Sequence, residues 1–492
     1  MRATFKDNET ECLELFLSQD IFNPERSFEQ ILMSPELIVD HNRWTRQGIE
    51  LIIRPECNQK CEYCYIARYG KELYPMEHRL NNEQIIERLD AFLDYVFNTR
   101  GIYMDHWELF AGDLFYDNLY FDVLDVFYKH LEKLYPKYRP VFDNVSGVIL
   151  TPTNFSFITD DEKCARVNEY IKKFEKFNWD VGFSISTDGK YAVDTRENRP
   201  LDDAYFEKLF NWAMEHPRNG FHPIISASNI DNAIKNYEWW RDMFDKYYGK
   251  NDERGFLPYW LEARNDEWDN DSIYKFNELL MFMLRDRLAM CDNDIDHLAY
   301  HFFNGDGENG TLLKGNMNDM LDITVPKNRI QHENLSCSIS ALFIVNLSNL
   351  SMVPCHRLTY PQFKGGHFTY EDGKITGVEA FNFFGYINII TVSAYDIPKC
   401  NECMYHNICH HGCLGAQFEA SGEVFLPALS VCELMKQSRY CILQALNDMG
   451  VLESARQQGL LNPETDLIYD TILREESFRR KGVPAWNCNV KN

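Results

Sequence analysis

The chain has 492 residues, 45% of them hydrophobic, and its 75 acidic against 50 basic residues give a formal net charge of −25. This length and composition predict an ordered protein of two or three domains. The acidic excess disfavours a nucleic-acid partner, and no apolar stretch is long enough to span a membrane. The first ten residues lack the apolar core of a signal peptide, so we expect a cytoplasmic protein whose 15 cysteines serve metal or redox chemistry rather than disulfides.

Strand-like and helix-like segments alternate after an N-terminal extension of residues 1–45, in which one short helix is expected over 11–18. Apolar runs predict strands over residues 49–54, 106–110, 147–151, 180–187, 222–228 and 258–264. Apolar residues at helical spacing predict helices over 83–98, with Asn82 as N-cap, and over 119–135, 161–177, 203–215, 230–248 and 272–290. These repeats predict an α/β fold with a parallel sheet covered by helices.

Three cysteines at CxxxCxxC spacing, Cys57, Cys61 and Cys64, directly follow the first predicted strand. They would lie at the C-terminal end of that strand, where α/β barrels carry their chemistry. A [4Fe–4S] cluster normally has four Cys ligands, so three would leave one iron open to a substrate or cofactor. Structural zinc usually takes four ligands, so the spacing favours a cluster over the alternatives, a zinc knuckle or a group of reduced thiols.

With Tyr63 as the aromatic residue before the third cysteine, this motif resembles the signature of the radical S-adenosylmethionine (SAM) superfamily. The resemblance implies a partial (β/α)6 barrel over residues 46–290. It implies that Cys57, Cys61 and Cys64 hold a [4Fe–4S] cluster whose fourth iron chelates SAM. It also implies an external one-electron donor, flavodoxin or ferredoxin, and cleavage of SAM to a 5′-deoxyadenosyl radical that abstracts a hydrogen atom from the substrate.

Residues after the second and third predicted strands align with the same family pattern. Ala111, Gly112 and Asp113, followed by Leu114, stand where the family has GGEP, a motif that contacts the SAM amino group. Asp113 alternatively serves as a turn residue. Asn154 ends a Thr-Pro-Thr-Asn run similar to the family's T-N-G, so the resemblance places it beside the cofactor.

Further candidates for cofactor contact follow the fourth to sixth predicted strands: Ser186, Asp188, Arg196 or Arg199, Ser228 and Arg264. The resemblance assigns Ser186 and Asp188 to the SAM ribose, where a carboxylate can accept two hydrogen bonds. One of the two arginines, Arg196 or Arg199, would meet the SAM carboxylate. Arg264 has an alternative role in a structural ion pair.

The C-terminal part carries a second set of cysteines. They are Cys400, Cys403, Cys409 and Cys413 at CxxCxxxxxCxxxC spacing, with Cys337 and Cys355 upstream and Cys432 downstream. Free thiols at such density would be reactive, so metal binding is expected, as iron–sulfur clusters or as structural zinc. A linker or insertion over 291–330 would precede this domain, and a helix and tail over 441–492 would follow it.

The second set resembles the SPASM domain of radical SAM enzymes, which holds two auxiliary [4Fe–4S] clusters, although Leu350 replaces an expected glycine. The resemblance covers residues 331–440 and implies three clusters in the whole chain. One auxiliary cluster would use the ligands Cys400, Cys403, Cys409 and Cys432. The other would use Cys337, Cys355 and Cys413, with His332, water or a substrate thiolate in the fourth place.

The resemblance implies a maturase that abstracts a hydrogen atom from a ribosomally made peptide, then forms a thioether or carbon–carbon crosslink or epimerises a residue. Its partner would be a peptide or protein substrate. One alternative resembles anaerobic sulfatase maturases, which make formylglycine with an Asp base after the second SPASM cysteine. His356 occupies that place here and can also act as a catalytic base. The other alternative is a non-enzymatic iron–sulfur or zinc scaffold.

Overall fold

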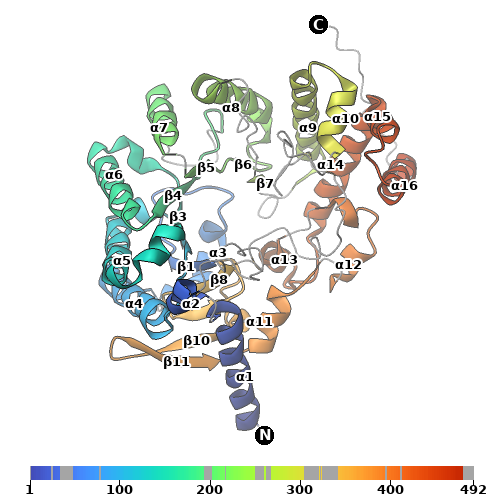
Figure 1. The fold of residues 1–492 in the computed structure, drawn as a ribbon. Helices are drawn as coiled ribbons and strands as arrows, with labels where there is room; N and C mark the ends of the chain where they lie inside the picture. Colours follow the sequence, from blue (N-terminus) through green and yellow to red (C-terminus); the bar gives the residue numbers. More distant parts are fainter. Residues whose placement is uncertain are drawn as a thin grey trace. The chain divides into compact units, whose positions relative to one another are not determined.

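The computed structural model describes residues 2–23, 26–33, 48–76, 79–192, 202–216, 218–249, 260–261, 268–303, 321, 323, 339, 342–393, 396–409 and 413–479 (Figure 1). The chain divides into two compact units. Unit 1 comprises Met1–Thr187, Arg196–His222 and Cys337–Val392. Unit 2 comprises Asp188–Thr195, Pro223–Ser336 and Ser393–Asn492. Part of the segment expected as the second iron–sulfur domain therefore belongs to the first unit.

Unit 1 is built on a nine-stranded sheet in the order β11-β10-β9-β8-β1-β2-β3-β4-β5. Its parallel part comprises β8 (Leu342–Asn346), β1 (Gly48–Arg54), β2 (His106–Ala111), β3 (Gly147–Thr153), β4 (Trp179–Ile185) and β5 (Asn219–Phe221). The antiparallel strands β9 (Ser351–Val353), β10 (Gly366–Glu371) and β11 (Lys374–Ala380) extend it beyond β8. The predicted α/β class with a parallel core is confirmed.

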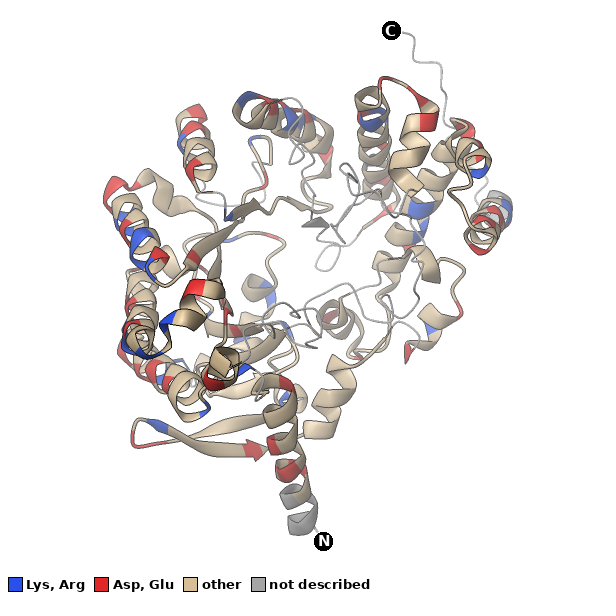
Figure 2. Cartoon of the chain, viewed as in Figure 1, with Lys and Arg blue, Asp and Glu red and all other residues tan. Residues whose placement is uncertain are grey.

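Helices connect the parallel strands of unit 1. They are α3 (Tyr65–Leu73), α4 (Asn82–Asp94), α5 (Leu119–Asn144), α6 (Asp161–Glu175) and α7 (Asp203–Glu215). Unit 1 also contains α1 (Arg2–Phe16), α2 (Phe28–Met33) and α11 (Phe383–Ile390). In Figure 1, α4, α5 and α6 lie in a row outside β1 to β4. All seven residues of β1 are buried, because a parallel strand with helices over it is covered on both faces. Acidic and basic residues alternate along α5 and α6 (Figure 2), so these helices present a mixed solvated surface.

Three local expectations in unit 1 are corrected. Asn81, not Asn82, is the N-cap of α4, because Gln84 three residues later completes a capping box with it. Helix α5 does not end at residue 135 but continues to Asn144, past Pro136 and Pro140, with a kink at Tyr138. The N-terminal helix is also longer than the expected 11–18, since α1 spans Arg2–Phe16.

Unit 2 contains a two-stranded parallel pair, β6 (Ile224–Ile225) and β7 (Trp260–Leu261), and helices of different lengths. These are α8 (Ala233–Tyr248), α9 (Asn270–Met290), α10 (Ile295–Phe303), α12 (Pro398–Asn401), α13 (Leu414–Ser421), α14 (Leu429–Asp448), α15 (Val451–Gln457) and α16 (Pro463–Arg479). The single strand expected over 222–228 is replaced by β5 and β6, with Pro223 between them, because proline has no N–H for a strand ladder. No described helix is long and apolar enough to cross a membrane.

Candidate functional site

The loop between β1 and α3 carries Cys57, Cys61 and Cys64, all half-buried. The backbone N–H of Gln59 donates to the Cys57 sulfur at 3.3 Å, and the N–H of Cys64 donates to the Cys61 carbonyl at 3.0 Å. The pKa of Cys57 is raised to about 11, chiefly by burial and also by the nearby Asp113, Cys61 and Cys64, while the hydrogen bond from Gln59 N–H opposes the rise. The loop therefore turns back on itself and brings the three thiols into one neighbourhood at the C-terminal end of β1.

Backbone hydrogen bonds join the end of β2 to the cysteine loop. Gly112 N–H donates to the Arg54 carbonyl at 2.9 Å, and Asp113 N–H donates to the Glu56 carbonyl at 2.8 Å. A Cβ at Gly112 would lie 2.2 Å from the Glu56 oxygen and 2.3 Å from the Pro55 oxygen. Position 112 consequently requires glycine, because no side chain fits between the two backbones.

Asp113 ties β2 to the end of β3. Its Oδ1 accepts from Phe115 N–H at 2.8 Å, while its Oδ2 accepts from the Thr153 hydroxyl at 3.0 Å and from Asn154 N–H at 2.9 Å. The side chain is fully buried, and burial raises its pKa against the effect of these hydrogen bonds. Both oxygens are thus engaged inside unit 1, which gives Asp113 a structural role, and its contact with a cofactor stays a prediction.

Asn154, at the end of β3, reaches the first cysteine directly. Its side-chain N–H donates to Cys57 Sγ at 3.7 Å and to Asn58 Oδ1 at 2.6 Å, and its Oδ1 accepts from Ser156 N–H at 3.0 Å. The amide is nearly buried, at 6% exposure. The carboxyl ends of β1 and β3, about a hundred residues apart in the sequence, therefore meet at the cysteine loop.

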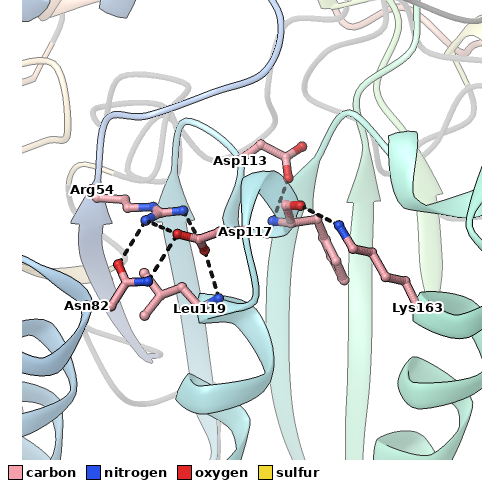
Figure 3. Close-up of polar contacts among 7 residues, drawn as sticks. Arg54, Asn82, Asp113, Asp117, Leu119 and Lys163 are labelled. Carbon is pink, nitrogen blue, oxygen red and sulfur yellow. Dashed lines mark hydrogen bonds and ion pairs between the residues drawn. The ribbon is translucent and has the colours of Figure 1, made fainter.

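An ion pair between Arg54 and Asp117 stabilises the start of the cysteine loop, where β1 ends (Figure 3). Arg54, the last residue of β1, donates from Nη1 to Asp117 Oδ2 at 2.9 Å and to Asn82 Oδ1 at 3.1 Å, and its Nη2 lies 2.8 Å from Asp117 Oδ1. Asp117 Oδ1 also accepts from Leu119 N–H. Burial alone would raise the pKa of Asp117, yet the hydrogen bonds from Arg54, Asn82 and Leu119 hold it below its ordinary value. These contacts join the end of β1 to the first turns of α4 and α5.

The remaining predicted cofactor residues are divided between the two units. In unit 1, Tyr63 is buried, Ala111 lies opposite Arg54 in the β2–β1 register, and Ser186 donates its N–H to the Thr153 carbonyl at 2.8 Å. In unit 2, Asp188 is fully buried and accepts from Ile224 N–H at 3.0 Å, and Ser228 is exposed beside Ser226. Arg196, Arg199 and Arg264 lie outside the described residues.

A histidine–carboxylate pair lies inside unit 1. His356 Nδ1 is 3.2 Å from Oε1 of Glu50, a β1 residue that is 2% exposed. The His356 ring stacks on Phe110 with ring centroids 4.0 Å apart, and Tyr74 donates its hydroxyl to the His356 carbonyl at 2.9 Å. Glu50 therefore holds one ring nitrogen of His356, and Phe110 covers one face of the ring. The His356 side chain is 22% exposed.

Cys355 lies on the same loop as His356 and close to the first cysteine motif. Burial raises the pKa of Tyr65 far above its ordinary value, and the nearby Tyr74, Cys64 and Cys355 add to that rise. Cys355 Sγ accepts from Arg357 N–H at 3.4 Å, and the Arg357 guanidinium lies over the Tyr65 ring at 4.6 Å. Buried Tyr65, the first residue of α3, therefore lies next to both the first cysteine motif and the 355–357 loop.

Four cysteines of the second set, Cys400, Cys403, Cys409 and Cys432, gather in unit 2. The pKa of Cys400 is raised to about 12, chiefly by burial and also by the nearby Cys409, Cys432 and Cys403. Cys403 N–H donates to the Cys400 carbonyl at 3.1 Å, and Cys432 lies in the first turn of α14. These four residues are the set that the resemblance to the SPASM domain assigns to one auxiliary cluster. Cys413 is the residue before α13, while Cys337 and His332 lie outside the described residues.

The spacing of the thiols bears on which metal would fit them. A tetrahedral zinc ion would hold its thiolates roughly 4 Å apart, given Zn–S bonds of about 2.3 Å. Among the described residues, neither cysteine set has three sulfur atoms mutually within 4.8 Å. A cubane cluster distributes its thiolates over separate iron atoms, whereas one zinc ion gathers them on a single centre.

A small pocket lies beside Arg54, at the start of the cysteine loop in unit 1. Its polar lining includes Arg54, Glu56, Arg79, Asn346 and Lys364. None of the predicted cofactor residues is part of that lining, so the pocket is not assigned to the cofactor.

Sequence reasoning missed Glu50 and Arg54 at this site. A signal for Glu50 was present, because it is a single charge inside the apolar run 49–53, where a carboxylate must be buried with a partner. The partner itself, His356, lies 306 residues away and could not be identified from the strand pattern.

Comparisons with known proteins return similarities of fold. No protein-family model and no curated protein matches the chain. Among solved structures, anSMEcpe with bound AdoMet and the Cp18Cys peptide is 16% identical, with a TM-score of 0.47, over 83% of this chain and 99% of that one. A hexahistidine-tagged form of anSMEcpe with bound AdoMet is 14% identical, with a TM-score of 0.46, over 87% of this chain and 99% of that one. Streptococcus suis SuiB bound to S-adenosylmethionine is 13% identical, with a TM-score of 0.39, over 82% and 80%. With TM-scores below 0.5, we draw no functional conclusion from these similarities.

Proposed function

We propose that this protein is a radical SAM enzyme that modifies a peptide or protein, with auxiliary iron–sulfur clusters in a SPASM-type region. The observation that carries the proposal is the convergence of the CxxxCxxC loop with Asn154, whose amide touches Cys57, at the carboxyl edge of a parallel sheet. When bound, a three-cysteine [4Fe–4S] cluster with SAM supplies the radical that removes a hydrogen atom from the substrate.

The residues around the loop would have distinct tasks. Cys57, Cys61 and Cys64 would hold the cluster, and the Asn154 amide would donate to a ligating sulfur, as outer-shell partners of metal ligands commonly do. Gly112 and the Arg54–Asp117 pair would keep the loop in place. The cysteines of the second set would hold the auxiliary clusters.

The proposal is tested by anaerobic reconstitution of the full chain, counting iron and sulfide, and assaying 5′-deoxyadenosine after adding SAM and a strong reductant. We expect about twelve irons per chain, from three four-iron clusters, and loss of SAM cleavage in Cys57→Ala. Cys164→Ala is the matched control, because Cys164 is a half-buried thiol on α6 outside both cysteine sets. Zinc in place of iron, or equal cleavage in the two variants, would contradict the proposal and leave the scaffold alternative.

For the reaction itself, we propose crosslinking or epimerisation of a ribosomally made peptide. Crosslinking would remove two hydrogen atoms from the peptide, and epimerisation would leave its mass unchanged. A small peptide gene beside this one would supply the substrate for mass spectrometry. Thioether formation would need a Cys in that peptide, so modification of a peptide without Cys would exclude this branch.

A second candidate, formylglycine formation on a protein Cys or Ser, is favoured by one observation, the Glu50–His356 pair. A buried carboxylate that holds one imidazole nitrogen leaves the other available as a base, and His356 follows Cys355. His356→Ala should then retain 5′-deoxyadenosine formation but lose the aldehyde product, which a hydrazide probe detects. His367→Ala, on β10, is the control. If His356→Ala makes the same product at the same rate, the base role is refuted.

A further inference from the structure

Three metal-binding side chains that belong to neither cysteine set come together in unit 2. Sγ of Cys291 and the ring nitrogens of His297 and His301 all lie within 4.8 Å of one another. The two Nε2 atoms are 2.7 Å apart. Cys291 is fully buried, His297 is exposed and His301 is half-buried, so the group runs from the protein interior to the surface.

The local sequence builds this cluster at the turn between α9 and α10, which are adjacent in Figure 1. Cys291 ends α9 and donates its N–H to the Arg287 carbonyl at 3.1 Å. Asp292 and Asn293 both adopt left-handed backbone, with φ of 56° and 59°, and reverse the chain within two residues. Asp294 then begins the next helix, because its Oδ1 accepts from the N–H of Asp296 and of His297.

On α10, His297 and His301 are four residues apart and therefore lie on the same face. The sharp turn directs that face toward the end of α9, where the Cys291 thiol is buried. Helix α10 also packs against α15, and Ser454 of α15 donates its hydroxyl to Asp296 Oδ1 at 2.5 Å. The position of the two histidines is therefore set by packing as well as by the turn.

The donor set matches a borderline-soft divalent cation. One thiolate and two imidazoles are common zinc ligands, and three protein ligands leave a fourth position for water. With Zn–N bonds of about 2.0–2.1 Å, the two nitrogens would be roughly 3.3 Å apart, slightly farther than observed. The exposed His297 ring can move by this amount. Asp292 and Asp294 flank Cys291 and favour a cation, while Arg287 opposes them.

We propose that Cys291, His297 and His301 bind one Zn²⁺ ion that joins the end of α9 to α10, with its fourth coordination position open to solvent. This ion would be additional to the iron of the two cysteine sets, since none of its ligands belongs to either set. Binding would replace the His297–His301 hydrogen bond with two metal–nitrogen bonds and convert the Cys291 thiol to a thiolate, with release of its proton to water.

The test measures zinc and iron together in the anaerobically prepared full chain, after incubation with one equivalent of Zn²⁺ and gel filtration. We expect about one zinc per wild-type chain and at least a tenfold lower zinc content in His297→Ala, with unchanged iron. His297 is exposed, so its replacement leaves the packing of unit 2 intact. The matched control is His216→Ala, a histidine of unit 1 whose Nδ1 bonds to the Trp212 carbonyl.

A second measurement reports on the sulfur ligand. Co²⁺ in place of Zn²⁺ should produce thiolate-to-cobalt charge-transfer absorption in the wild type, and this band should be absent in Cys291→Ser. Equal zinc content in wild type and His297→Ala would overturn the proposal, as would a cobalt band that survives in Cys291→Ser. If Cys291→Ser does not fold, the His297→Ala comparison still decides. Neither result depends on SAM cleavage, so this proposal can fail while the proposed function holds.

Discussion

Replacing Gly112 by alanine should detach β2 from the cysteine loop. The new Cβ would lie 2.2 Å from the Glu56 carbonyl oxygen and 2.3 Å from that of Pro55, and both obstacles are backbone. One strand end must then move by about 1 Å to restore van der Waals contact. That movement breaks the hydrogen bonds from Gly112 N–H and Asp113 N–H, which contribute about 1 kcal/mol each. With about 1–3 kcal/mol for the forced contact, the variant should lose about 3–5 kcal/mol of stability.

The measurement is thermal unfolding of the anaerobic protein followed by circular dichroism, together with its iron content and 5′-deoxyadenosine production. A loss of this size lowers the Tm by roughly 6–20 °C, at about 2–4 °C per kcal/mol. Gly220→Ala is the matched control, because this glycine of β5 has open space where a Cβ would be added. If Gly112→Ala retains the Tm, iron and activity of Gly220→Ala, the argument from close backbone approach is wrong.

Three further predictions concern the Arg54–Asp117 ion pair, the Asn154 amide and the second cysteine set. Asp117→Asn should lower the free energy of unfolding at pH 7 by about 1 kcal/mol, a value discounted for solvent screening. Because the pKa of Asp117 is lowered from 3.8, the stability difference between wild type and variant should be present above pH 3.8 and vanish as the pH falls through the pKa of Asp117 in the folded state. The measurement is the Tm of both metal-free proteins as a function of pH. Asn154→Ala should slow SAM cleavage by about 10–100-fold, because Cys57 loses its amide donor; an unchanged rate would refute this role. Cys432→Ala should reduce the iron content by about four atoms per chain while SAM cleavage persists, and unchanged iron would remove Cys432 from the ligands.

Several features could be predicted from residue patterns because their causes are local. The boundaries of α7 agree with the expected 203–215, and the ends of β1 to β4 lie within two residues of the expected positions. These elements could be predicted because a helix buries one apolar face and a central strand is a short run of buried apolar residues. The resemblance to the SPASM domain groups Cys400, Cys403, Cys409 and Cys432, and these residues are neighbours in the structure. Helix α5 was predicted too short, because packing of its buried face outweighs the cost of Pro136 and Pro140.

The sequence by itself determined the α/β class, the positions of strands β1 to β4 along the chain, and the placement of the first cysteine motif after β1. These follow from patterns within a few residues. The tertiary structure alone decided that Glu50 meets His356, that Asn154 contacts Cys57, and that Asp113 accepts hydrogen bonds from the end of β3. Such contacts join segments up to 306 residues apart, and they depend on how strands are ordered and registered in the sheet, which no local pattern specifies.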